Sequence, residues 1–191
     1  QSAIVKAGGA LIDSNGYNIT IVQPLLDGGT GGGLVKSGAG VLTLSGANTY
    51  SGNTTVNAGQ LTLADNASLK IVLGDSGVNN KLTGTGSVQL DGDFTLDTTA
   101  ASTTVGSSWQ VVDVGTLSVS YGSTFTLTGG TETSPGSGVW IVGSYRFTAS
   151  TGIVDVLSDS DSDGLSDAWE QQIIDANSSD GITNISQVNP G

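Results

Sequence analysis

The amino-acid sequence predicts an all-β protein built as a parallel β-solenoid, with a short acidic appendage at its C-terminal end. Short runs of β-branched and apolar residues recur through the first 156 positions. The chain contains 30 glycines among its 191 residues, and Gly, Asn and Asp separate these runs as turn residues do. An acidic segment follows the last run.

Several of the runs alternate between apolar and polar side chains, as a strand with one buried face does. Leu42 and Leu44 are expected to point inward, whereas Val41, Thr43 and Ser45 point outward. The clearest expected strands are 11–12, 19–22, 41–44, 54–56, 61–63, 69–72, 87–90, 94–96, 110–112, 124–127, 139–142 and 153–156.

Two all-β architectures compete for this pattern. A β-sandwich needs about seven longer strands with turns every 8–12 residues. A parallel β-helix stacks shorter strands in rungs of about 20–25 residues. The strands here are short and aromatic residues make up only 5% of the chain, so the solenoid is favoured.

The composition excludes several classes of function. The chain has no Cys and no His, which removes disulfides, thiolate or imidazole metal sites and His-based catalysis. Its net charge of −12 argues against binding to nucleic-acid phosphates. No apolar run approaches the roughly 18 residues of a membrane helix, so the sequence predicts no transmembrane segment.

The stretch 31–63 resembles the passenger-associated β-strand repeat of bacterial autotransporters. The matching positions are Gly32, Gly33, Leu34, Lys36, Gly38, Gly40, Leu42, Leu44, Gly46, Asn48, Tyr50, Gly52, Thr54, Val56, Gly59 and Leu61. The resemblance implies a right-handed parallel β-helix in a secreted or cell-surface bacterial protein. The residues expected to fill its bore are Leu34, Leu42, Leu44, Val56 and Leu61. Asn48 is expected to cap backbone groups at a bend.

We divide the chain into a solenoid over 1–96, terminal rungs or a cap over 97–156, and an appendage over 157–191. The middle part holds six of the ten aromatic residues, namely Trp109, Tyr121, Phe125, Trp140, Tyr145 and Phe147. Repeat proteins need a cap that closes the open end of the core. These rings are therefore expected to form an aromatic-rich cap, and the competing interpretation is an exposed platform that binds sugars.

The segment 159–170, DSDSDGLSDAWE, fits a twelve-residue calcium loop without a gap. Gly164 at position 6 allows the sharp turn that brings the oxygens to one point. An all-oxygen ligand set favours calcium over zinc or copper. The alternative is a solvated acidic tail. The expected ligands are Asp159, Asp161, Asp163, the Leu165 carbonyl, Asp167 and Glu170.

A helix is expected over 167–176, because apolar residues recur there on one side. A second, incomplete loop around Gly181 would use Ser178, Asp180, the Ile182 carbonyl, Asn184 and Gln187. Chance similarity explains this second loop equally well. The first loop resembles the calcium motifs of thrombospondin type 3 and dockerin-like repeats, which implies a place at the end of a secreted bacterial protein.

Candidate catalytic residues are few. Asp91 and Asp93 have the spacing of a carboxylate pair, but they flank Gly92 as turn residues do. Arg146 is the only arginine and is remote in sequence from the acidic loop. The sequence therefore does not predict an enzyme.

The predicted function is that of a secreted or cell-surface structural or adhesive module with a calcium-stabilised C-terminal segment. Its expected partners are further copies of itself, assembled end to end into filaments, or other cell-surface proteins and glycans. The alternative is a carbohydrate-binding or lyase-like β-helix module.

Overall fold

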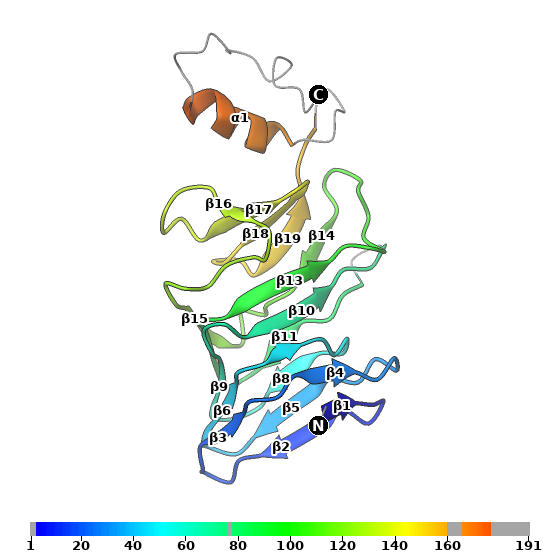
Figure 1. The fold of residues 1–191 in the computed structure, drawn as a ribbon, viewed down its shortest axis with the longest axis vertical. Coiled ribbons are helices and arrows are strands. Elements are labelled where there is room, and N and C mark those ends of the chain that lie inside the picture. The colour runs from blue at the N-terminus through cyan, green and yellow to red at the C-terminus, as the bar shows by residue number, and fades with distance from the viewer. Residues whose placement is uncertain (1–2, 76–77, 160–165, 177–191) are drawn as a thin grey trace.

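A computed structural model describes residues 3–75, 78–159 and 166–176 (Figure 1). The chain winds through stacked rungs of short strands. The first rung holds β1 (Ala3–Val5), β2 (Ala10–Asp13) and β3 (Ile19–Ile21), and the second holds β4 (Leu25–Asp27), β5 (Leu34–Ser37) and β6 (Val41–Leu44). The third holds β7 (Ala47–Asn48), β8 (Thr54–Val56) and β9 (Gln60–Leu63), and the fourth holds β10 (Ser68–Val72), β11 (Leu82–Gly84) and β12 (Ser87–Leu90). A further, incomplete rung is formed by β13 (Asp93–Asp97) and β15 (Ser118–Tyr121).

Strands of successive rungs pair in parallel and form the faces of the solenoid. One face has the strand order β11-β8-β5-β2, and a second has the order β15-β12-β9-β6-β3. The third face holds the pair β1-β4 and the group β13-β10-β7. Leu34 pairs with Thr54 and Thr54 with Leu82, so the repeat lengthens from 20 to 28 residues. The extra residues lie in the turns, which leaves the ladders in register.

The predicted β-solenoid is confirmed, and its core follows the expected alternation. Leu42 pairs with Leu61, and Leu61 pairs with Val88. Each of these three side chains is no more than 1% exposed. The five predicted bore residues Leu34, Leu42, Leu44, Val56 and Leu61 are all buried. Period-two patterning thus identifies which face of each strand lies inside.

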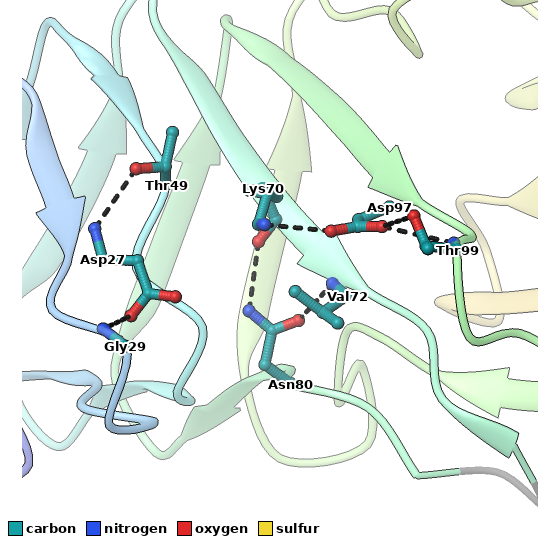
Figure 2. A network of polar contacts seen from close by, with 8 residues as sticks. All are labelled: Asp27, Gly29, Thr49, Lys70, Val72, Asn80, Asp97 and Thr99. Atoms are coloured by element: carbon teal, nitrogen blue, oxygen red, sulfur yellow. Dashed lines mark hydrogen bonds and ion pairs between the residues drawn. The ribbon is translucent and has the colours of Figure 1, made fainter.

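Polar side chains tie neighbouring strands together near the corners (Figure 2). Lys70 on β10 donates to Asp97 on β13 at 2.9 Å. Asn80 accepts a hydrogen bond from the Val72 amide and donates one to the Lys70 carbonyl, at 2.7 and 3.0 Å. The backbone amide of Asp27 on β4 donates to the Thr49 hydroxyl of the next rung at 3.2 Å.

An antiparallel sheet follows the solenoid (Figure 1). Its strands, in spatial order, are β14 (Ser108–Gln110), β19 (Ile153–Val156), β18 (Tyr145–Thr148), β17 (Val139–Val142) and β16 (Thr131–Glu132). Phe147 on this sheet packs against Phe94 of the last solenoid rungs, with ring centroids 5.8 Å apart. Both rings are fully buried.

The aromatic residues of this region pack inward. Phe125 contacts Phe94 and Trp140 edge to face, with ring centroids 5.1 and 5.0 Å apart. Trp109 is 1% exposed, and its indole N–H donates to the Gly74 carbonyl at 2.9 Å. Five of the six rings are buried and Tyr121 is partly buried, so they form the cap expected at this end, and the exposed sugar-binding platform considered from the sequence is wrong for the five buried rings.

Two expected strands differ from the structure. Residues 124–127 form no strand, and within them only Leu127 makes an isolated parallel bridge, to Phe94. The strand expected at 110–112 lies at Ser108–Gln110 instead. Both lie where rungs give way to the antiparallel sheet, so long turns replace the regular spacing on which the predictions depended.

The helix α1 spans Asp167–Ala176, the bounds expected from the sequence. Its first backbone hydrogen bond runs from the Glu170 amide to the Ser166 carbonyl at 3.0 Å, so Ser166 is the residue that caps it. In the part of the chain that the structure describes, no helix has the length and apolar character needed to span a membrane.

Candidate functional site

The least ordinary side chain in the described core is Lys36, a lysine that lies wholly inside the bore. It is 0% exposed, although lysine is almost never fully buried without a partner. Lys36 pairs with Ile12 of the first rung and with Val56 of the third. Its aliphatic stem is thus stacked between two apolar side chains, and its ammonium group extends toward the turn that follows β5.

Four oxygen atoms surround that ammonium group. Lys36 Nζ donates to the carbonyls of Gly38, Ser37 and Ala58 at 2.7, 2.8 and 3.1 Å, and it lies 3.0 Å from Ser14 Oγ. Burial lowers the pKa of the Lys36 ammonium, and the nearby carboxylate of Asp13 acts in the opposite direction. The group therefore joins three rungs from inside the solenoid.

Ser14 completes this internal cluster. Its hydroxyl oxygen accepts from the Gly40 amide at 3.1 Å and donates to the Ser37 carbonyl at 3.2 Å. Every polar atom in the cluster thus has a partner within the protein, which is the condition under which a buried charge is tolerated. The cluster is suited to holding turns in place and exposes no charge for binding a ligand.

Asn48 does what the sequence predicted. It is 1% exposed, and its Oδ1 accepts from the Leu25 amide at 3.2 Å. Its Nδ2 donates to the carbonyls of Gly46 and Ser68 at 2.8 and 3.0 Å. One side chain therefore caps backbone groups in three successive rungs.

The sequence identifies Lys36 as a position of the repeat but assigns no role to it. A signal was present, because Leu34 and Lys36 are two residues apart in one strand and so share a face. Lysine is usually exposed to solvent, so residue type alone predicts that Lys36 lies outside the core. The sequence likewise assigns no role to Tyr50, which is 0% exposed and whose hydroxyl hydrogen-bonds with Thr54 Oγ1 at 2.6 Å.

The predicted calcium segment is described only in part. Asp161, Asp163 and the Leu165 carbonyl fall within 160–165, outside the described residues, so the ligand set stays a prediction. The residues proposed for the second loop, Ser178, Asp180, Ile182, Asn184 and Gln187, also lie outside them. Over residues 3–75, 78–159 and 166–176, no group of three or more acidic side chains is placed to hold a metal ion.

The described ligand candidates lie at the two ends of this segment. The Ser158 hydroxyl donates to Asp167 Oδ2 at 2.6 Å, and the Asp167 amide donates to the Ser158 carbonyl at 2.9 Å. Residues on either side of 159–166 are thus held together. Glu170, the predicted twelfth ligand, is 0% exposed on the first turn of α1.

The residues considered for catalysis make structural contacts. Asp91 accepts a hydrogen bond from the Gln89 side chain at 2.8 Å, and Asp93 accepts one from the Thr126 hydroxyl at 2.8 Å. Arg146 forms a two-point ion pair with Asp155 on the neighbouring strand, at 3.0 and 2.5 Å. These contacts hold turns and strands together. They occupy the two carboxylates and the guanidinium group that were considered for catalysis.

Residues 34–63 match the family model of the passenger-associated transport repeat. The match spans β5 to β9 and therefore Lys36 and Asn48, whereas Ser14, the partner of Lys36 in the preceding rung, lies outside it. It confirms the repeat recognised in the sequence and does not extend to the acidic segment. No curated protein and no solved structure matches the chain significantly. The repeat and the β-solenoid fold together suggest a structural module like those of autotransporter passengers.

Proposed function

We propose that this chain is a structural module of a secreted or cell-surface bacterial protein. In this role a rigid β-solenoid carries adhesive contacts, and a bound calcium ion stabilises the C-terminal segment. The observation that carries the proposal is the passenger-associated repeat at 34–63, folded as most of the second rung and the whole third rung of a continuous parallel stack. Its buried polar side chains, Lys36 above all, are used to join rungs.

The calcium part of the proposal depends on the spacing of residues 159–170 and on the contacts at its ends. The Ser158–Asp167 contacts hold the residue before the predicted loop close to its ninth position, so the chain between them forms a closed loop. Five closely spaced carboxylates repel one another unless a cation lies among them. A bound calcium ion would therefore order this segment and the start of α1 against the solenoid.

The proposal also includes association between copies of the module, because a solenoid has edge strands at its ends. The competing function, carbohydrate binding or lyase activity, has less support. Asp91, Asp93 and Arg146 are engaged in structural contacts, and five of the six aromatic rings of the cap are buried, with Tyr121 partly buried. Specific turnover of acidic polysaccharides in a reducing-sugar assay, or specific signals on a glycan array, would favour that competitor.

Limited proteolysis tests whether calcium stabilises the C-terminal segment while the solenoid is stable without it. With calcium, we expect the 191-residue protein to resist cleavage along its length. With a chelator, cleavage is expected within 159–170, leaving a resistant solenoid fragment. Asp163→Asn should behave in calcium as the parent protein behaves in chelator. Asp175→Asn is the matched control, because it removes one charge from the same acidic region outside the predicted ligands. Cleavage that does not depend on calcium would refute the proposed stabilisation.

A further inference from the structure

The last rung of the solenoid is continued on two of its three faces and not on the third. On the face of β10 and β13, the Phe94 amide donates to the Thr126 carbonyl at 3.0 Å. On the face of β8 and β11, the Val112 amide donates to the Gly152 carbonyl at 3.0 Å. The five-stranded face ends at β15, and within the described residues no strand pairs with its outer side. The gap arises inside the chain, which leaves this face after β15 and forms the antiparallel sheet (Figure 1).

The outer edge of β15 carries backbone groups that no described strand uses. The Ser118 amide donates to the Gly86 carbonyl, just before β12, at 3.1 Å. Alternate residues of a parallel strand bond to the same neighbour, so the N–H and C=O groups of Val119 and Tyr121 face away from β12. Proteins commonly protect such an edge with lysine, proline or another charge, and the four residues of β15, SVSY, include none of these. This edge is therefore a template for another strand.

Two columns of inward side chains also end at β15. Val119 lies on Val88 of the preceding rung, and Tyr121 lies on Leu90. Val88 and Leu90 are at most 1% exposed, whereas Val119 and Tyr121 are only partly buried. A further strand on this face would bury the second pair as β15 buries the first.

A cavity of about 250 Å³ lies against these side chains. Its lining consists of Val114, Leu117, Val119, Tyr121, Ala149 and Ser150, which are all uncharged. A water molecule takes up about 30 Å³ in the liquid, so the cavity has room for much more than one bridging water. The hydroxyl oxygen of Tyr121 is buried without a hydrogen-bond partner among the described residues, although buried polar groups normally have one. The rung is thus incomplete in its packing and in its hydrogen bonds.

The shape and charge of the gap suit a short segment better than a second copy of this chain. Ala149 and Ser150, in the turn between β18 and β19, line the cavity together with β15, so the approach to β15 is bounded by the protein itself. A second copy would bring the same turn to the same place. Each copy also carries a net charge of −12, which opposes close approach, whereas an uncharged segment meets no such repulsion.

We propose that this gap binds an extended, uncharged peptide segment of another protein, which adds a strand to β15. The backbone of the segment bonds to the outward N–H and C=O groups of Val119 and Tyr121, and its alternate apolar side chains enter the cavity. Charged side chains are excluded there, because the cavity offers them no opposite charge. This inference names a partner for the adhesive contacts of the proposed function and rests on that part of it.

Hydrogen exchange measured by NMR on the 191-residue protein tests this inference. The probe is a synthetic peptide with the sequence of residues 40–46, blocked at both ends, which is uncharged and includes β6 of the same face. We expect saturable binding in the range up to millimolar peptide, with slower exchange of the Val119 and Tyr121 amides. In the control peptide both leucines are replaced by serine, which keeps the backbone groups and removes the apolar side chains. Its dissociation constant should be about tenfold higher or more.

Ser150→Trp is the informative variant of the protein, because Ser150 is exposed and lines the cavity, which the larger side chain would fill. We expect the dissociation constant of the peptide to rise about tenfold or more, with the melting temperature unchanged. Ser134→Trp is the matched control. Ser134 is also exposed, but it lies in the turn between β16 and β17 and away from the cavity lining, so binding should persist.

Three results would overturn the inference: no binding by a protein that melts like the parent, equal binding of the two peptides, or equal binding by the two variants. Protection of the Val119 and Tyr121 amides that rises with protein concentration alone would also overturn it, because the strand would then come from a second copy. Each of these results leaves the structural role and the calcium site standing, because the proteolysis experiment tests them separately.

Discussion

The ammonium group of Lys36 lies 3.0 Å from the hydroxyl oxygen of Ser14, a residue of the preceding rung, and both side chains are buried. This contact joins two turns that are 22 residues apart in the chain. A third turn is joined through the Ala58 carbonyl, at 3.1 Å. The ammonium group of Lys36 thus links three successive rungs from inside the solenoid, and it is not exposed to a ligand.

Lys36→Met tests how much the hydrogen bonds of the buried ammonium group contribute to the stability of the fold. Methionine keeps an unbranched apolar stem between Ile12 and Val56 but leaves the oxygen atoms around Nζ without their donor. Unpaired buried acceptors cost about 1–3 kcal/mol each, so we expect the free energy of unfolding to fall by about 2–4 kcal/mol in urea denaturation.

Lys70→Met is the matched control for that experiment. Lys70 also donates to a residue of another rung, Asp97, but both side chains of this ion pair are partly exposed, at 27 and 30%. Partly solvated pairs contribute about 0–1 kcal/mol. Equal losses of stability in the two variants would show that the internal position of Lys36 has no special importance.

Asp97 predicts a dependence of stability on pH. Hydrogen bonds from the Thr99 hydroxyl, then from Lys70 and the Thr99 amide, lower the pKa of the Asp97 carboxyl to about 2. A carboxyl with a lower pKa in the folded state stabilises the fold above its unfolded pKa, and this contribution is lost as pH falls from about 4 to about 2. Asp97→Asn should therefore be less stable than the parent by about 1 kcal/mol at pH 7, after allowance for solvent screening. Denaturant titrations should show this difference vanishing near pH 2, and a difference that stays constant would contradict the assignment.

Leu42→Asp tests the inward and outward assignment of β6. Leu42 is 0% exposed between Ile19 and Leu61, so a carboxylate there would be buried without a partner. We expect a loss of at least about 4 kcal/mol, seen as unfolding or insolubility. Thr43→Asp changes the adjacent, outward position and should melt close to the parent. If the two variants melt alike, the assigned register is wrong.

Gly38→Ala tests whether a turn beside the lysine cluster requires glycine. Gly38 has a φ of 76°, and a Cβ there would lie 2.3 Å from Asp13 Oδ1 and 2.6 Å from the Asn15 amide nitrogen. Gly16 has a similar φ of 84°, but a Cβ there would extend into open space, so Gly16→Ala measures the backbone strain alone. We expect about 1–2 kcal/mol for Gly16→Ala and clearly more for Gly38→Ala by thermal denaturation. Equal losses of stability would mean that the atoms of Asp13 and Asn15 move away from the added Cβ at Gly38 without a loss of free energy of unfolding.

Much of the solenoid could be predicted because its rungs repeat a simple rule. Short apolar and β-branched runs predict β6, β8, β12, β17 and β19 with their observed bounds, and the alternation within 41–45 places Leu42 and Leu44 inside. Alternation says nothing about the partner of a strand. The antiparallel pairing of β17 with β18 depends on a short turn at Gly143, and this sequence signal was not recognised.

The candidate site was less predictable, for two physical reasons. The repeat's lysine follows the period of the strand, yet residue type alone assigns a lysine to solvent, and only the four oxygen atoms around its Nζ explain its burial. For the acidic segment, by contrast, residue types alone predict a role. Its ligand spacing is readable from residue types, because a metal loop is a local device whose geometry lies within twelve consecutive residues.

Calcium binding by residues 159–170 is the remaining prediction. Asp159 directly follows Ser158, which is hydrogen-bonded to Asp167, and Glu170 is buried on the first turn of α1. Calcium added to chelated protein should change the fluorescence of Trp169 and raise the melting temperature of the C-terminal segment, since metal binding and folding are coupled. Extracellular modules of this type bind in the range of about 10⁻⁴–10⁻³ M, so the titration must extend that far. Magnesium should substitute poorly, because it gives up its water ligands reluctantly. Asp163→Asn should abolish the response while the solenoid melts unchanged, and Asp175→Asn should preserve it. If calorimetry detects no heat at millimolar calcium, the acidic segment is a solvated tail and α1 owes its stability to other contacts.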